Sequence, residues 1–175
     1  MRLILDELNM KQIIFINPKE EFSIYGKALL PPLNLAVLAA YTPENYNLKI
    51  IDETVQKINF NEDVDIVAIT STTHSAKRAY SIATEFKKRK VPVVMGGIHA
   101  SMLPNEALQY VDSVVIGEAE NIWQTVIKDF ETNQLKKIYS GKKSDLNNLR
   151  LPRRDLFLKN YVSEPVYTTR GCPFN

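Results

Sequence analysis

Short apolar runs alternate with helix-like segments along most of the chain. Runs at 12–16, 48–51, 66–69, 91–95 and 113–116 are rich in Val and Ile and are strand candidates. Continuous runs of this kind are typical of strands that are covered on both faces. Strand–helix alternation favours a parallel sheet. We therefore predict an α/β fold with a five-stranded parallel sheet and helices on both faces, flavodoxin-like (Rossmann-like) in class.

Four helices are predicted, three between these strands and one after the last strand. Pro31 and Pro32 precede the first, at 33–41, which is apolar nearly all round and should be heavily covered. A second, at 74–89, has an apolar stripe through Tyr80 and Phe86, and a short one lies near 105–109. The last should bury Ile122, Trp123, Val126, Ile127 and Phe130.

Composition narrows the class of protein. The chain has 175 residues, 45% hydrophobic, so one compact domain with a real core is expected. With 22 basic and 20 acidic residues it shows no nucleic-acid footprint. No apolar stretch approaches the ~20 residues of a membrane span, and Asp6 and Glu7 break a signal-peptide layout. Cys172 is the single cysteine, which excludes an internal disulfide. We expect a soluble, cytoplasmic protein.

The residues after each strand exclude two common α/β classes, because parallel sheets bind ligands beyond the carboxyl ends of their strands. A dinucleotide fold needs glycines after its first strand, but residues 17–21 contain none, and no P-loop is present. A phosphoacceptor receiver would need an Asp after the third strand and a Lys after the fifth. Thr70-Ser71 and Gly117-Glu118 stand there instead.

These strand ends carry small and polar residues that predict a ligand cleft. Paired glycines allow a ligand close to the backbone, and consecutive hydroxyls can bond a polar ligand. Helix capping for one hydroxyl, and an ordinary turn for the glycines, are the alternatives. The three segments are Thr70-Ser71-Thr72-Thr73, Gly96-Gly97-Ile98-His99 and Gly117-Glu118-Ala119-Glu120.

Two further sets of residues invite chemical interpretations. His74 and His99 are far apart, with no cysteine or acidic partner at ligand spacing, so a zinc site is not expected. Glu118 and Glu120 could be a carboxylate pair for acid–base work. However, Glu120 near a helix N-terminus can instead favour the helix dipole.

The pattern changes after Phe130. Residues 136–139 could form a short strand, 140–148 are polar, and 149–157 are punctuated by proline. We predict an α/β domain at 1–140, a linker at 141–164, and the start of a truncated second domain at 165–175. The chain ends in Arg170-Gly171-Cys172-Pro173-Phe174-Asn175, where Cys172 is either a structural cysteine beside a turn or the first of a CxxxCxxC set.

In order and spacing, these segments resemble the N-terminal cobalamin-binding domain of cobalamin-dependent radical S-adenosylmethionine enzymes, the group that includes the anaerobic Mg-protoporphyrin monomethyl ester oxidative cyclase. The resemblance begins near Lys11. Its further pieces are Pro31-Pro32, Asp52-Glu53, Pro104 and Glu106, the 149–156 segment, and Arg170 to Pro173.

The resemblance implies a cofactor and its contacts. The corrin ring would lie across the carboxyl edge of the sheet, with its nucleotide tail inserted into the sheet region. Segment 17–26 contains no histidine, so cobalt would lack the lower ligand that methionine-synthase domains supply. The residues implied to bind cobalamin are Thr70, Ser71, Thr72, Thr73, Gly96, Gly97, Ile98, His99, Gly117 and Glu118.

The parent protein implied by this resemblance is a methylase or cyclase. It would also use S-adenosylmethionine and a [4Fe–4S] cluster, with Cys172 as the first cluster ligand and a C-terminal radical domain as the partner. The present chain alone is not expected to catalyse turnover of a substrate. The alternative is a non-enzymatic ligand-binding or regulatory α/β module whose cleft is empty or repurposed.

Overall fold

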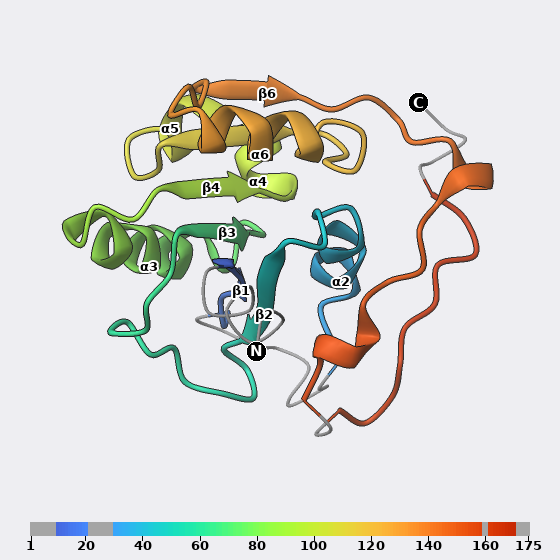
Figure 1. Cartoon of the computed structure of the whole chain (residues 1–175). Helices are drawn as coiled ribbons and strands as arrows, with labels where there is room; N and C mark the ends of the chain where they lie inside the picture. Colours follow the sequence, from blue (N-terminus) through green and yellow to red (C-terminus); the bar gives the residue numbers. More distant parts are fainter. Residues whose placement is uncertain (1–9, 21–29, 159–160, 171–175) are drawn as a thin grey trace, which may run out of the picture.

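A six-stranded sheet organises the protein in the computed structural model, which describes residues 10–20, 30–158 and 161–170. The strand order is β2-β1-β3-β4-β5-β6, and every neighbouring pair is parallel (Figure 1). The predicted parallel α/β class is confirmed. The strands are β1 (Lys11–Asn17), β2 (Tyr46–Asp52), β3 (Ile66–Thr70), β4 (Val93–Gly96), β5 (Ser113–Ile116) and β6 (Ile138–Ser140).

Helices cover both faces of the sheet, as predicted. On one face α2 (Leu33–Ala40) and α6 (Trp123–Glu131) share a buried cluster with Phe15 of β1. On the other, α3 (Ala76–Lys88), α4 (Ile98–Met102) and α5 (Pro104–Ala107) pack against Ile14 and Ile16. Because successive side chains of a strand point to opposite faces, the continuous apolar run of β1 supplies both clusters. The α4 helix was not predicted.

The sequence predicted five strands, and this count is wrong because β6 is a sixth. Tyr139 is its one buried residue; its hydroxyl donates to Asp129 Oδ2 (2.8 Å), and burial first, then Asp129, raises its pKa to about 12. A three-residue strand is too short for a clear alternating pattern. The usual handedness of β–α–β connections would not favour this strand either. The helices α2 and α6 lie on the same face of the sheet, but the connection through α2 leads from β1 toward one edge of the sheet and the connection through α6 leads from β5 toward the other. The two connections therefore have opposite hands, although one hand is strongly preferred.

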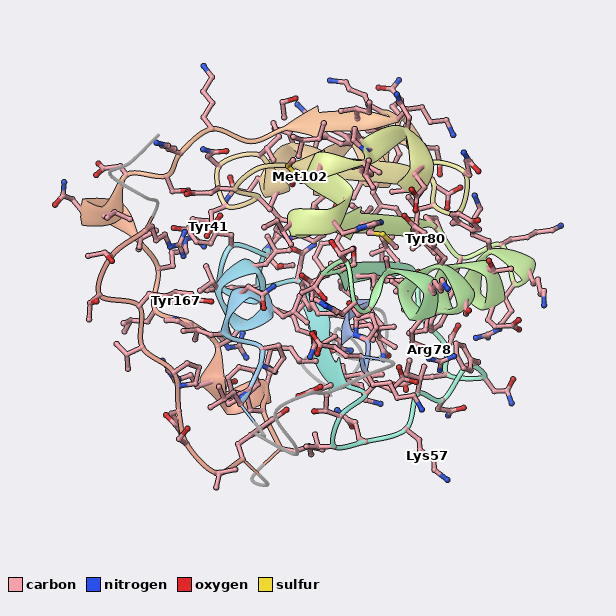
Figure 2. The ribbon with its side chains drawn as sticks, turned by 180° about the vertical axis from the view of Figure 1, so that it is seen from behind. Tyr41, Lys57, Arg78, Tyr80, Met102 and Tyr167 are labelled. Atoms are coloured by element: carbon pink, nitrogen blue, oxygen red, sulfur yellow. The ribbon has the colours of Figure 1, made fainter. Side chains whose placement is uncertain are left out.

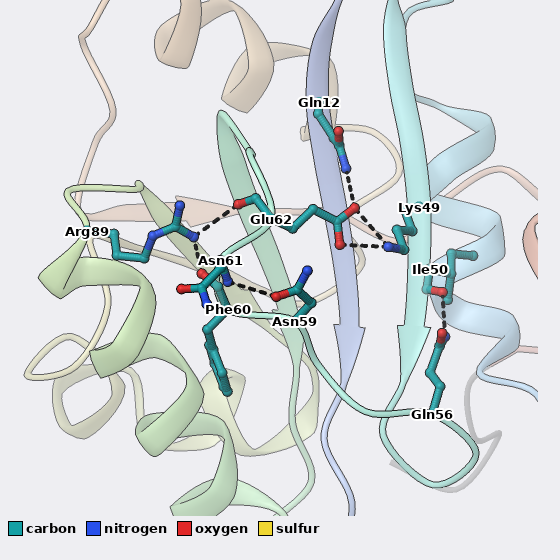
Figure 3. A network of polar contacts seen from close by, with 9 residues as sticks. All are labelled: Gln12, Lys49, Ile50, Gln56, Asn59, Phe60, Asn61, Glu62 and Arg89. Atoms are coloured by element: carbon teal, nitrogen blue, oxygen red, sulfur yellow. Dashed lines mark hydrogen bonds and ion pairs between the residues drawn. The ribbon is translucent and has the colours of Figure 1, made fainter.

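A group of hydrogen bonds around Glu62 fixes the connection between β2 and β3. Glu62 accepts hydrogen bonds from Gln12 Nε2 (2.8 Å) and from Lys49 Nζ (2.6 Å to Oε2), as Figure 3 shows. Arg89, just beyond α3, donates to the backbone carbonyl of Glu62 (3.0 Å). The connection is thereby held against the α3 side of the sheet, where the tilted rings of Phe60 and Phe86 pack with 5.3 Å between their centroids.

After β6 the chain runs beside α2 and then turns back (Figure 1). Its described regular structure consists of two 3-10 turns, Leu146–Asn148 and Arg154–Leu156. The backbone N–H of Arg153 donates to the Ala36 carbonyl (2.9 Å), and the Tyr161 hydroxyl donates to Asp52 Oδ2 (3.0 Å). Phe157 packs partly buried on the α2 side of the core. These contacts attach the segment to α2 and to the end of β2. None of the helices in the described ranges is long and apolar enough to cross a membrane.

Candidate functional site

A cavity of about 390 Å³ lies between the sheet and the helices α2 and α6. It opens where β3, β4 and β5 end, the edge at which the sequence predicts a cleft. On this face the carboxyl-terminal halves of β3 and β4 line the cavity between the two helices. The lining residues are Asn34, Leu35, Leu38, Ala68, Ile69, Thr70, Val94, Gly96, Gly97, Val115, Gly117, Glu118, Ala119, Glu120, Trp123, Tyr167, Thr169 and Arg170.

Small side chains at alternating strand positions create this space. On the cavity face, β3 presents Ala68 and Thr70, and β4 ends in Gly96. On the opposite face the neighbouring positions carry larger side chains such as Val67 and Met95, both in the other core cluster. Because alternate residues of a strand share a face, the size difference falls entirely on one side of the sheet.

The deep part of the cavity is apolar and rigid. Leu35 and Leu38 of α2 face Trp123, which begins α6 and is 1% exposed. The indole Nε1–H donates to Thr42 Oγ1 (2.9 Å), and the centroids of the Trp123 and Phe15 rings are 5.9 Å apart. Since its polar atom is already bonded, Trp123 can offer only its apolar surface to a ligand. This part of the cavity suits a flat, weakly polar group.

Polar groups surround the rest of the cavity. Asn34 Nδ2 donates to Thr70 Oγ1 (2.9 Å), so a carboxamide and a hydroxyl stand together on one side. On the other side the Arg170 guanidinium pairs with Glu120 and lies 3.7 Å from Glu118 Oε2. Tyr167, which Figure 2 shows beside α2, belongs to the same wall. The arrangement can place hydrogen-bonding groups around a ligand whose inner end is apolar.

Gly97 is required by the protein's own backbone. Its φ is 94°, and a Cβ at this position would lie 2.6 Å from the Ser71 carbonyl oxygen. The β4 loop therefore packs directly on the β3 loop, and the His99 N–H donates to that same carbonyl (3.2 Å). Gly96 is different: a Cβ there would meet its nearest neighbour, Val115 O, at an ordinary 3.7 Å. Of the two glycines, Gly96 is the one whose missing side chain leaves room for a ligand.

The predicted binding residues divide into two groups. Thr70, Gly96, Gly97, Gly117 and Glu118 line the cavity. The others do not line it, and Cys172 lies outside the described residues. Ser71 is 2% exposed, its hydroxyl having no hydrogen-bond partner among the described residues, and the exposed Thr72 forms a turn with Ser75 (3.2 Å between hydroxyls). The remaining three are Thr73, Ile98 and His99.

His99 belongs to a hydrogen-bonded cluster between α3 and the α4–α5 segment. The Tyr80 hydroxyl donates to Glu106 Oε1 (3.0 Å), so its oxygen accepts from His99 Nε2 (2.8 Å). Burial, followed by Glu106 and Tyr110, raises the Tyr80 pKa. Figure 2 shows Tyr80 at α3, on the opposite side from Tyr167. No group of three or more His, Cys, Asp or Glu side chains within the described ranges could hold a metal ion.

The fold and the cavity together define a ligand-binding α/β domain, and the comparisons identify its family. The model described as the B12 binding domain matches residues 26–127, more than half of the chain. The chain therefore belongs to the B12-binding domain family.

Several curated proteins that resemble this chain are named methyltransferases. The chain is 42% identical over 151 residues to bacteriochlorophyllide d C-8(2)-methyltransferase of Chlorobaculum tepidum, covering 81% of this chain and 34% of that protein. It is 28% identical over 184 residues to the C-12(1)-methyltransferase of the same organism (98% and 40%). An uncharacterized methyltransferase of Pyrococcus horikoshii is 31% identical over 180 residues (83% and 39%). The chain thus spans two fifths or less of the length of these relatives.

Proposed function

We propose that the cavity receives the nucleotide tail of cobalamin, and that the chain is the cobalamin-binding part of a methyltransferase. The observation that carries this proposal is the cavity itself, about 390 Å³, formed by small residues at the carboxyl edge of the sheet. This volume lies within the range of small-ligand sites. The corrin macrocycle is too large to enter, so it lies outside, across the ends of β3, β4 and β5.

The lining fits the chemistry of a nucleotide tail. The flat base would contact Leu35, Leu38 and Trp123, which offer only apolar surface. Asn34 and Thr70 carry the amide and hydroxyl that a sugar and phosphate can bond. Gly96 leaves the backbone of β4 open to close approach.

The histidines support binding without a protein ligand on cobalt. His74 is exposed and is not among the lining residues, and His99 is bonded to Tyr80 away from the cavity. Segment 17–26 contains no histidine. Bound cobalamin supplies a cobalt centre for methyl transfer, and the residues described here bind and orient it.

The parent reaction is proposed from the relatives and the end of the chain. The similar proteins are named methyltransferases, which favours the methyltransferase type over the cyclase type. Arg170-Gly171-Cys172-Pro173 supports a radical S-adenosylmethionine class, with Cys172 as one ligand of a [4Fe–4S] cluster. In this proposal residues 1–140 bind cobalamin, 141–164 are the linker and 165–175 begin the radical domain.

Gel filtration with hydroxocobalamin tests the site. The wild-type chain should retain the coloured cofactor, without the spectral change that marks histidine ligation. Gly96→Val should abolish retention while remaining folded, because the new side chain enters the cavity beside Val115. His74→Ala, on an exposed residue outside the cavity, is the control and should retain the cofactor. A folded wild-type protein that retains nothing at high cofactor concentration would instead indicate a non-enzymatic module with an empty or repurposed cleft.

A further inference from the structure

The end of the described chain meets the β5–α6 loop at the cavity. Arg170 pairs with Glu120, 50 residues earlier, and also lies 3.7 Å from Glu118. Only 16% of the Arg170 side chain and 12% of the Glu120 side chain are exposed. Exposed ion pairs contribute little because water screens them. This pair is largely removed from water, so one guanidinium compensates two carboxylates at the cavity wall.

The loop that carries the two carboxylates is itself held in place. Glu118 Oε2 accepts from the backbone N–H of Ser144 (2.7 Å), and the Gly117 N–H donates to Ser101 Oγ of α4 (3.0 Å). A Cβ on Gly141 would lie 1.7 Å from the Glu118 carbonyl oxygen, so the chain crosses this loop at backbone contact. The loop is thus a fixed anchor, and Arg170 connects the last described segment to it.

We propose that Arg170 is a latch. Its ion pairs with Glu118 and Glu120 hold Tyr167, Thr169 and Arg170 as one wall of the cavity. Arg170 is a positioning residue in this role.

Latching and ligand binding are coupled as a consequence. A ligand that contacts this wall binds the latched state better than the open one and stabilises it. By reciprocity, the latch strengthens ligand binding by the same factor. The identity of the ligand rests on the proposed function, whereas the latch itself can be measured without any ligand.

A charge-exchange series tests the proposal in the full 175-residue chain. Arg170→Glu and Glu120→Arg each leave like charges together, and the double variant restores an opposite pair. Chymotrypsin cleavage after Tyr167, which needs the segment to leave the cavity wall, is measured without ligand, and release of hydroxocobalamin is measured by displacement. Each single variant should speed both cleavage and release by about tenfold, as expected for loss of a charge-assisted hydrogen bond. The double variant should recover most of both effects.

Arg153→Gln is the matched control. Its guanidinium pairs with the exposed Asp155 in the same segment and does not line the cavity, so both rates should stay at the wild-type value. Urea midpoints establish that each variant is folded.

The outcomes separate the latch from the proposed function. Unchanged chymotrypsin cleavage after Tyr167 in both single variants would overturn the latch. Faster cleavage with unchanged cobalamin release would overturn the coupling. Absence of cobalamin binding by the wild type would overturn the proposed function, while ligand-free cleavage would still decide whether Arg170 holds the segment.

Discussion

The two faces of strands β3, β4 and β5 share a backbone but are filled differently. On the α3 side, Ile69, Met95 and Val114 are buried in a closed core. On the α2 and α6 side, the neighbouring positions Thr70 and Gly96 open onto a cavity. Protein interiors are normally packed as densely as organic crystals, so an unfilled volume of this size needs a reason. The comparison indicates that one face stabilises the sheet while the other is kept open for a ligand.

The strongest test compares Met95 and Gly96, which are adjacent but face opposite sides. Met95 is fully buried, so Met95→Ala should lower the free energy of unfolding by about 2–5 kcal/mol. Gly96→Ala should change it by about 1 kcal/mol or less, because the new Cβ meets nothing closer than 3.7 Å. Urea unfolding measures both. Equal costs at the two positions would mean that both faces are equally tightly packed.

A somewhat smaller effect is expected at Gly97. Gly97→Ala should cost about 1–3 kcal/mol, because φ is 94° and the Cβ would lie 2.6 Å from the Ser71 carbonyl oxygen. Urea unfolding again provides the measurement, with Gly96→Ala as the control. A neutral result would show that the β3 and β4 loops can separate at no cost.

On the α3 side, an ion pair between Arg78 and Glu53 should make the stability of the protein depend on pH. Arg78 Nε donates to Glu53 (2.9 Å). Burial opposes ionisation, but the guanidinium and the Lys19 N–H outweigh it and hold the Glu53 pKa below its usual 4.5. The folded pKa is the lower one, so this stabilisation is present above about pH 4.5 and is lost as the pH falls through the folded value.

Arg78→Met should remove this dependence, a difference of about 1 kcal/mol between neutral and acidic pH. Urea midpoints at several pH values compare the two proteins. Parallel pH profiles for wild type and variant would contradict the assignment.

The smallest effect is expected at the cavity rim. Thr70→Val keeps the shape of the side chain but removes the acceptor for Asn34 Nδ2, which should cost about 0.5 kcal/mol of stability and weaken cobalamin binding a few-fold. Equilibrium titration provides the affinity. Thr73→Val, at an exposed position outside the cavity, should bind as the wild type does.

The sequence predicted the sheet well, because its strands are buried on both faces. Ile13 to Ile16 are all fully buried, and such runs leave few alternatives. The strand ends also indicated the edge of the sheet at which the cavity opens. The five-residue α4 was missed, and the short strand suggested at 136–139 was not counted in the sheet, because neither segment is long enough to show a clear period.

The inner half of the site could not be predicted in the same way. Leu35 and Trp123 have the periodic apolar signature of helix core residues, and lining a cavity leaves the same signature. His99 suggested a ligand contact until the fold placed Tyr80 against it, 19 residues earlier in the chain. The one available signal was the alternation of small and large residues in β3 and β4, with Ala68 and Gly96 beside Ile69 and Met95.

The position of Trp123 has a spectroscopic consequence. It is the only tryptophan in the chain, and its ring is fixed by Thr42 at the apolar end of the cavity. Corrinoids absorb light in the region where indole emits, so an occupied cavity should quench the intrinsic fluorescence through energy transfer. A single emitter in a single environment reports occupancy without a label. The protein thus carries its own optical probe at the depth where apolar contact with a ligand would occur.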